Sequence, residues 1–155
     1  PDTVVDDEEE IIYEEGVKKA LPYHDLPLAS RDMKWDAGSA RKRLQQRAGG
    51  EDWKIAKYSN GFMLVSGNGD KLGDYRLPYA DVVDGTLKAI PRGLFAVAGA
   101  IGGARTGGMN ITASEKSSVE RNLRNYYKKM SKEFDQEIVP PFDKSNGKID
   151  EQVTY

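Results

Sequence analysis

The sequence predicts an α+β protein: a small antiparallel β-meander over about residues 58–90, packed with three helices and carrying an extended arm at each end. Three observations predict this arrangement. Two segments repeat apolar residues every three to four positions, which is the period of an amphipathic helix. Short apolar runs separated by turn residues lie between those segments, as in hairpins. Both ends are rich in charge and proline, which is typical of extended chain.

The first element is an extended, acidic N-terminal arm over residues 1–34. Within it, Asp6–Glu10 is a block of like charges that repels itself and resists packing. The short apolar run Ile11–Tyr13 follows this block and is suited to dock on a sheet or a partner. Pro22 and Pro27 keep the rest of the arm extended, because each lacks an amide donor and restricts the residue before it.

A compact α+β domain is expected over residues 35–134, and it begins with a helix over about residues 37–48. Asp36 is a good N-cap for this helix, and Gly49 is suited to end it. Apolar residues recur every four positions on one side of the helix, at Ala40, Leu44 and Ala48. Basic residues cover its other faces.

The centre of the chain reads as an antiparallel meander. Four runs have strand propensity: Lys57–Val65, Leu72–Leu77, Ala80–Val83 and Thr86–Ile90. The last two flank Asp84-Gly85, a pair that tolerates the positive φ angles of a two-residue hairpin turn. Pro78 interrupts the second run, so that run should be an edge strand or end there.

Two further helices are predicted over about residues 92–103 and 113–134. Pro91 is suited to the first turn of the former, where its missing amide hydrogen costs nothing. Thr112 and Glu115 have the spacing of a capping box at the start of the latter. Its apolar face recurs at helical spacing, at Val119, Leu123, Tyr126 or Tyr127, Met130 and Phe134. Residues 135–155 then form an extended C-terminal tail.

Charge is strongly segregated along the chain. Residues 1–16 carry eight acidic side chains and no basic one, residues 17–134 carry 21 basic and 12 acidic ones, and residues 135–155 carry two basic and five acidic ones. The three segments therefore have net charges of −8, +9 and −3, which give the net −2 of the whole chain. A basic middle flanked by acidic ends favours docking of an end on a basic surface, its own or a neighbour's.

The composition excludes several classes of site. Of 155 residues, 38% are hydrophobic and none is cysteine, which rules out disulfides and thiolate metal sites. No apolar run approaches the ~20 residues that cross a bilayer, so a membrane is not an expected partner. The chain begins at Pro1, before which an initiator methionine is usually removed, so Pro1 is expected to be the mature end of a complete small protein.

No catalytic, cofactor or metal site can be assembled from the residue pattern, and the chain is not expected to be an enzyme. His24 is the only histidine and lies in the proline-bracketed arm without a nucleophile beside it. The acidic block points its side chains in diverging directions instead of converging on an ion. Residues 143–151 resemble a calcium loop, but Phe142 would stand where the first aspartate belongs. The glycines of residues 99–108 lack the lysine that completes a phosphate-binding loop.

The residues expected to bind a partner all lie in the two ends. They form an electrostatic latch, an apolar plug and a terminal anchor: Asp6, Asp7, Glu8, Glu9 and Glu10; Ile11, Ile12 and Tyr13; and Val153 and Tyr155. Nucleic acid is the alternative ligand, since Arg41–Arg43, Arg47 and the basic face of the 113–134 helix can contact phosphates. It is the weaker alternative, because lysine-rich helix faces are usually solvated and the isoelectric point is about 5.5. Trp35 and Trp53 are expected to pack in the core or at its rim.

The stretch from Leu21 to about Met130, roughly two-thirds of the chain, resembles a domain associated with head-morphogenesis genes of tailed bacteriophages, found beside or fused to prohead proteases. The resemblance rests on an ordered set of motifs: Pro22-Tyr23; Trp35-Asp36 with the helix of Arg41–Leu44; Lys57-Tyr58 before Gly61-Phe62; Tyr75-Arg76-Leu77-Pro78; Asp81–Gly85; Leu87–Gly93; and Tyr126-Tyr127. The catalytic residues of the proteases are not matched.

This resemblance implies a phage structural protein made in the host cytoplasm and located in the virion. A stand-alone copy with long arms is similar to a capsid decoration or cement protein, or a minor head protein. Its partners would be the major capsid protein or other head proteins and neighbouring copies of itself, reached by the arms. Two alternatives remain open: a head-to-tail or DNA-contacting head component, and an adjunct of the maturation protease that is absent from the finished particle.

Overall fold

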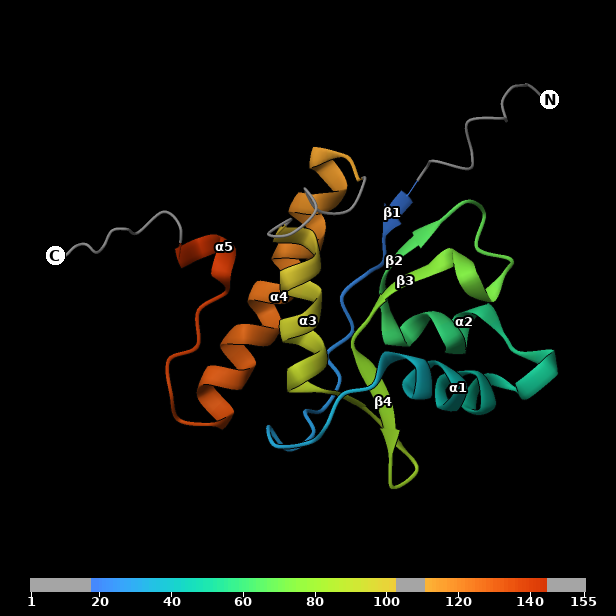
Figure 1. Ribbon diagram of the computed structural model, residues 1–155, viewed down its shortest axis with the longest axis horizontal. Coiled ribbons are helices and arrows are strands. Elements are labelled where there is room, and N and C mark those ends of the chain that lie inside the picture. Colours follow the sequence, from blue (N-terminus) through green and yellow to red (C-terminus); the bar gives the residue numbers. More distant parts are fainter. Residues whose placement is uncertain (1–17, 103–110, 145–155) are drawn as a thin grey trace, which may run out of the picture.

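The computed structural model describes residues 18–102 and 111–144. Within these residues the chain has an α+β fold, as predicted (Figure 1). The helices are α1 (Ala37–Ala48), α2 (Ile55–Tyr58), α3 (Pro91–Gly102), α4 (Ala113–Glu133) and α5 (Pro141–Lys144). The strands are β1 (Lys18–Ala20), β2 (Phe62–Ser66), β3 (Tyr75–Pro78), β4 (Ala80–Val83) and β5 (Thr86–Ala89).

The strands form two small antiparallel sheets between two pairs of helices. One sheet has the order β1-β2-β3, and the other is the hairpin of β4 and β5. Helices α3 and α4 lie side by side against one side of the strands, and α1 and α2 lie at the other (Figure 1). The core between them is rich in buried aromatic rings, with Tyr58, Phe62 and Tyr75 in mutual contact.

The three long helices lie where the sequence predicts them, because their ends are set by local chemistry. The Asp36 carboxylate accepts a hydrogen bond from the Ser39 amide at 3.2 Å and caps α1. Gly49 ends α1 at a φ of 128°, a backbone angle that favours glycine. The Thr112 hydroxyl oxygen accepts from the Glu115 amide at 3.1 Å and caps α4.

The prediction of a single meander over residues 58–90 is wrong in its start and in its continuity. Lys57 and Tyr58 lie in the short helix α2 and residues 59–61 form a 3₁₀ turn, so β2 starts only at Phe62. This turn places the Tyr58 ring in the core, where it packs against Trp53, Phe62 and Tyr75. Residues 72–74 form another 3₁₀ turn before β3.

The predicted run of strands also breaks in two after β3. Leu77 has a φ of 59°, which turns the chain at the end of β3 so that β4 leaves the first sheet. The hairpin of β4 and β5 closes as predicted, with φ angles of 52° at Asp84 and 79° at Gly85.

The described part of the expected N-terminal arm, residues 18–34, is extended but lies against the body. β1 pairs with β2, and the Leu21 amide donates to the Met63 carbonyl at 2.9 Å. Further along, the Ala29 amide donates to the Ala89 carbonyl at 2.9 Å. Four apolar side chains of this segment pack on the core: Leu21, Tyr23, Leu26 and Leu28. Residue-by-residue propensity does not reveal this packing. The body therefore begins well before residue 35.

The described part of the expected C-terminal tail, residues 135–144, also returns to the body. The Ser131 hydroxyl accepts from the Ile138 amide at 2.8 Å and donates to the Ile138 carbonyl at 3.2 Å. Helix α5 then packs against α3, and Arg124 of α4 holds Asp143 in an ion pair at 2.9 Å. Residues 135–144 thus form a strap along α4.

A close approach of α1 to the turn before β2 gives the first testable prediction. A Cβ at Gly61 would lie 2.7 and 2.9 Å from the two methyl carbons of Leu44, a side chain with almost no exposure. Gly61→Ala should therefore lower the free energy of unfolding by about 1–3 kcal/mol through overpacking. Gly73→Ala is the control, because a Cβ there meets nothing within 4 Å. Equal urea midpoints for the two variants would contradict this packing.

Candidate binding surface on helix α4

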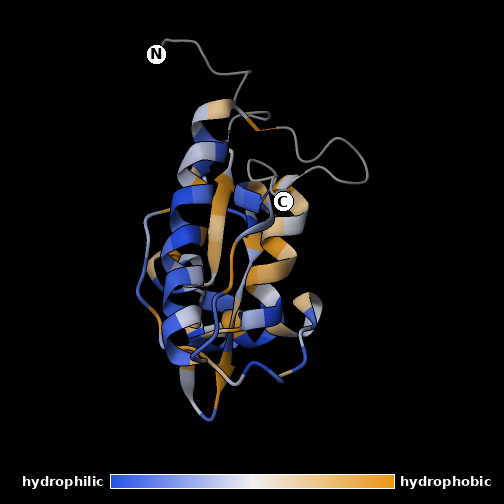
Figure 2. Cartoon of the chain, turned by 90° about the vertical axis from the view of Figure 1, so that its left-hand side faces the viewer, coloured by the Kyte–Doolittle hydropathy of each residue, from blue (hydrophilic) through white to orange (hydrophobic). Residues whose placement is uncertain are grey.

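Helix α4 has two chemically distinct sides. Val119, Leu123, Tyr126, Tyr127 and Met130 are buried against the strands and α3, as the apolar spacing predicts. The outer side is hydrophilic along its length, in contrast to the largely hydrophobic α3 beside it (Figure 2). Any function of α4 beyond packing therefore resides on its outer side.

Three exposed basic residues follow one line along this outer side. Arg121, Lys128 and Lys132 are separated by seven and four residues, which places them on one face of the helix. Within residues 18–102 and 111–144, none of the three forms an ion pair. We call these three residues the basic stripe.

The basic residues on either flank of the stripe are already engaged. Arg124 pairs with Asp143 of the strap at 2.9 Å, and Lys129 pairs with Asp25 at 2.9 Å. The hydrogen bond from Lys129 lowers the pKa of the Asp25 carboxyl below its usual value. These two pairs fasten the extended segments to α4, whereas the stripe between them keeps its charge available.

A hollow lies on each side of the stripe. The first, of about 640 Å³, lies between α4 and the strap, with Tyr127, Ile138 and Val139 among its lining residues. The second, of about 690 Å³, is lined by Asp25, Asn125, Lys128, Lys129, Lys132 and Glu133. Lys128 and Lys132 belong to both hollows.

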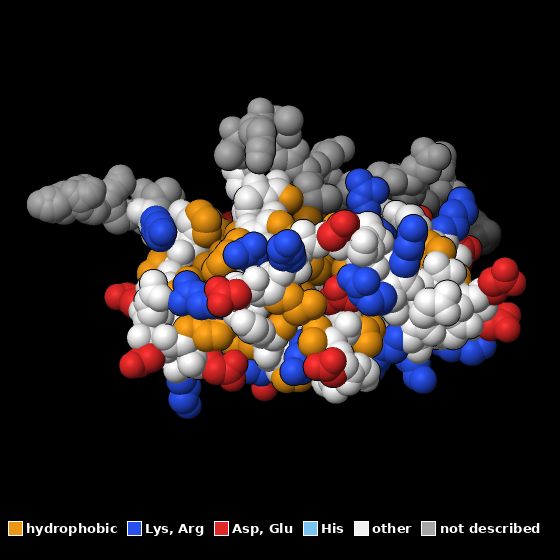
Figure 3. Space-filling model, turned by 60° about the horizontal axis from the view of Figure 1, so that its bottom comes forward, with side chains coloured by type: hydrophobic (Ala, Val, Ile, Leu, Met, Phe, Trp, Pro, Cys, Tyr) orange, Lys and Arg blue, Asp and Glu red, His pale blue; other side chains and the backbone are white. Residues whose placement is uncertain are grey.

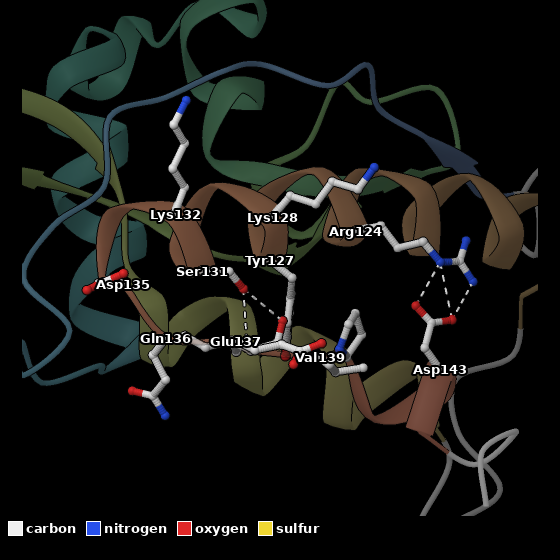
Figure 4. Close-up of a pocket in the computed structure, with 12 residues that line it drawn as sticks. Arg124, Tyr127, Lys128, Ser131, Lys132, Asp135, Gln136, Glu137, Val139 and Asp143 are labelled. Atoms are coloured by element: carbon white, nitrogen blue, oxygen red, sulfur yellow. Dashed lines mark hydrogen bonds and ion pairs between the residues drawn. The ribbon is translucent and has the colours of Figure 1, made fainter. Parts of the chain in front are cut away.

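The close-up of the first hollow shows how these side chains are directed. Lys128 and Lys132 rise from α4 away from residues 135–139, whereas Arg124 reaches across to Asp143 (Figure 4). The two lysines therefore form a ridge between the hollows instead of filling either one. Both side chains border both hollows.

Tyr126 fixes the wall of the second hollow. Its hydroxyl donates to the His24 carbonyl and accepts from the Leu26 amide at 3.1 Å, which holds residues 24–26 along α4. The Tyr126 ring packs between Tyr23 and Tyr79, at centroid distances of 5.0 and 5.4 Å. Burial raises the pKa of Tyr126, so its hydroxyl keeps its proton and remains a donor.

Tyr126 gives the second testable prediction. Tyr126→Phe would remove one hydrogen bond from each of two backbone groups, the Leu26 amide and the His24 carbonyl, which would keep their bond to each other at 2.9 Å. Losing the bonds that hold these groups to α4 should cost about 0.5–1.5 kcal/mol of unfolding free energy. Tyr127→Phe, one residue along, is the matched control, because the Tyr127 hydroxyl makes no hydrogen bond within the described residues. Thermal or urea unfolding measures both. A Tyr127→Phe loss as large as that of Tyr126→Phe would contradict the assigned role.

The chemistry that this surface offers is recognition of negative charge. Its stripe carries three cations, and its hollows add apolar and hydrogen-bonding groups beside them. In the part of the chain that the structure describes, no group of three or more metal-ligating side chains comes together. No helix among the described residues is long and apolar enough to cross a membrane.

The basic residues of α1, which the sequence also marks as phosphate-binding candidates, have other roles. Arg41 donates to the Tyr75 carbonyl at 2.8 Å and lies over the Phe62 ring. Arg43 forms a two-pronged ion pair with the buried Asp81 carboxylate, at 2.8 and 2.9 Å. These two arginines hold α1 to the strands, so the basic middle of the sequence is partly structural.

The tryptophans occupy packing positions, and the histidine lies in the segment that runs along α4. Trp53 contacts the rings of Tyr58 and Tyr75, and Trp35 lies against Gly93 of α3, so both belong to the core or its rim, as predicted. His24 contributes its backbone carbonyl to Tyr126.

The predicted partner-binding residues all lie outside the described residues: Asp6, Asp7, Glu8, Glu9, Glu10, Ile11, Ile12, Tyr13, Val153 and Tyr155. Their roles stay predictions. Sequence reasoning identified the basic face of α4 but missed the hollows beside it. The hollows are walled by residues 24–26 and by the strap, which propensity alone assigns to free arms. The signal in the sequence was the presence of apolar residues in those segments, such as Leu26 and Ile138, which are partly buried in the structure.

Comparisons of the chain with protein-family models, with curated proteins and with solved structures found no match. The resemblance to the phage head-morphogenesis domain therefore stays a prediction from the motifs of the sequence.

Proposed function

We propose that this chain is a structural protein of a bacteriophage virion that binds the major capsid protein or another head protein. In this role it is a decoration, cement or minor head protein, and its terminal segments contact neighbouring subunits. The head-protein context comes from the ordered motifs between Leu21 and Met130. The binding role is supported independently by the surface of α4.

One observation carries the binding role: Lys128 and Lys132 are exposed, lack ion pairs among the described residues, and separate two hollows of several hundred Å³. Unpaired cations beside apolar and hydrogen-bonding groups suit a partner that presents carboxylates on a protein surface. Electrostatic complementarity of this kind sets orientation and association rate. It would make attachment weaken as salt rises.

The experiment that tests the virion role is the copy number of this chain in purified particles of the phage that encodes it. Quantitative mass spectrometry would measure it against the major capsid protein. A simple ratio to the capsid protein is expected for a decoration protein. About a dozen copies per particle would instead indicate a unique vertex, and absence from the particle would refute the virion role and favour the protease adjunct.

A DNA-contacting head component is the second candidate, and the line of three cations on α4 is the observation that favours it. Phosphate contacts by all three would make the logarithm of the binding constant fall with a slope of about −3 against the logarithm of salt concentration. Figure 3 shows Lys and Arg interspersed with Asp and Glu on the lower face of the molecule, so that face offers no extended positive track. Absence of DNA retention at low salt would remove this candidate.

A further inference from the structure

We propose that the acidic segment Asp6–Glu10 binds the basic stripe of α4 in the same molecule while the protein is free, so that a partner must displace it. The inference rests on the proposed function only in assigning an external partner to the same surface. The docking itself requires no partner. It makes the binding surface of the free protein a covered one.

Charge and length of the two elements match. Asp6–Glu10 carries five carboxylates and no basic residue, and the stripe carries three cations without ion pairs among the described residues. Five extended residues span about 13–18 Å. Arg121 and Lys132 are eleven residues apart, which is about 17 Å along a helix. The acidic segment can therefore lie along the whole stripe.

The path of the described chain brings the acidic segment within reach. The side-chain amide of Asn122 donates a hydrogen bond to the Leu21 carbonyl at 3.0 Å, and the Tyr126 hydroxyl donates one to the His24 carbonyl. Residues 21–24 therefore run along α4 from its middle toward its C-terminal half. Going back from Leu21, the described chain ends at Lys18, in β1 beside α4. Seven residues, 11–17, lie between Glu10 and Lys18, so the two are eight residue steps apart.

Eight residue steps of extended chain reach about 26 Å, which is enough to return from Lys18 to the level of Arg121 on the outer side of α4. A tether this short gives the segment an effective concentration in the millimolar range. Each exposed pair contributes at most about 1 kcal/mol, so the tether and the number of pairs together favour docking. The docked state must then be sensitive to salt.

The absence of cysteine from the chain allows a clean test. Thr3→Cys introduces one site for a nitroxide spin label just before the acidic segment in the full-length protein. Paramagnetic broadening of backbone amide signals then reports which residues the segment approaches. We expect broadening at the outer residues of α4 around Arg121, Lys128 and Lys132, and none at α1. The broadening should disappear in about 1 M salt, where the Debye length is about 3 Å.

Matched variants separate docking from chance proximity. Lys128→Gln with Lys132→Gln should abolish the α4 broadening, whereas Lys42→Gln with Arg47→Gln, on the exposed side of α1, should leave it unchanged. Replacing all five acids of the segment by their amides should also abolish it. The amide spectrum away from the substituted residues and from α4 should stay the same in every variant, which verifies folding.

A mixed sample decides whether docking occurs within one molecule. Spin-labelled protein at natural isotope abundance is added to ¹⁵N-labelled protein that carries no spin label. Only contacts between molecules can then broaden the observed signals. No broadening is expected in this mixture. Broadening confined to the mixture, broadening spread equally over α1 and α4, or no broadening in either sample would each overturn the proposal. None of these outcomes bears on the copy number in particles, which tests the proposed function separately.

Discussion

Raising the pH above about 10 is expected to unfold this protein in one cooperative transition, because its core contains five buried tyrosines: Tyr58, Tyr75, Tyr79, Tyr126 and Tyr127. Burial raises the pKa of each of them above the ordinary value of 10.0, to about 12 for Tyr79 and Tyr127. In the unfolded chain the same phenols ionise near pH 10. Their contribution to stability is therefore complete below pH 10 and is lost as the pH rises through the folded-state values.

The expected effect is large compared with the stability of a domain. Above pH 10 each such tyrosine lowers the free energy of unfolding by up to about 1.4 kcal/mol per pH unit. Tyr79, Tyr126 and Tyr127 together remove up to about 4 kcal/mol per unit, to which Tyr58 and Tyr75 add, and the total stability of a domain is only about 5–15 kcal/mol. The transition should thus be complete within one to two units above pH 10.

A titration that follows phenolate absorbance and far-ultraviolet circular dichroism together measures this transition. The two signals should change over the same pH range, because the buried phenols ionise only when the chain unfolds. Tyr127→Phe removes one of the five groups and should make the loss of stability with pH less steep. Ionisation of most tyrosines with the helices intact would contradict the burial of these rings.

The second large effect is expected from Arg43→Met, which would leave the buried carboxylate of Asp81 without a cation. The Asp81 side chain is 3% exposed and accepts two hydrogen bonds from Arg43 and one, at 2.7 Å, from the Val82 amide. The hydrogen bonds to Asp81 raise the pKa of Arg43. Because the Arg43 side chain is 51% exposed, water can reach part of the pair. We expect a loss of about 2 kcal/mol, less than for a fully buried pair.

A double-mutant cycle measured by urea unfolding isolates this pair. Adding Asp81→Asn to Arg43→Met removes the stranded charge and keeps an oxygen for the Val82 amide, so the double variant should be more stable than Arg43→Met alone. Arg47→Met, at an exposed position of the same helix, is the control and should change stability little. Additive effects of the two substitutions would show that Arg43 and Asp81 do not interact.

The elements that the sequence predicted well are those whose limits depend on neighbouring residues. The cap at Asp36, the glycine at position 49 and the Asp84-Gly85 turn each act within a few residues. Helices α1 and α4 follow from these signals together with their apolar spacing. Their ends lie within one residue of the predicted ones.

What the sequence did not predict depends on pairing across long distances. β1 becomes a strand only because β2 offers it an edge, and its three residues carry no strand signal of their own. The hollows beside the basic stripe likewise require Tyr126 to hold His24 and Leu26, and Ser131 to hold Ile138. Local composition does not reveal such contacts. Parts of the two expected arms therefore proved to form the walls of the hollows on α4.

The most direct test of the central claim is to add purified protein back to capsids made without it and to measure occupancy. Wild type should bind and saturate. Lys128→Glu with Lys132→Glu should bind about tenfold more weakly, equivalent to about 1.4 kcal/mol. Lys42→Glu with Arg47→Glu, the same charge change on α1, should bind like wild type. Failure of the wild type to bind would contradict the capsid role, and equal binding by both double variants would contradict the assignment of the surface to α4.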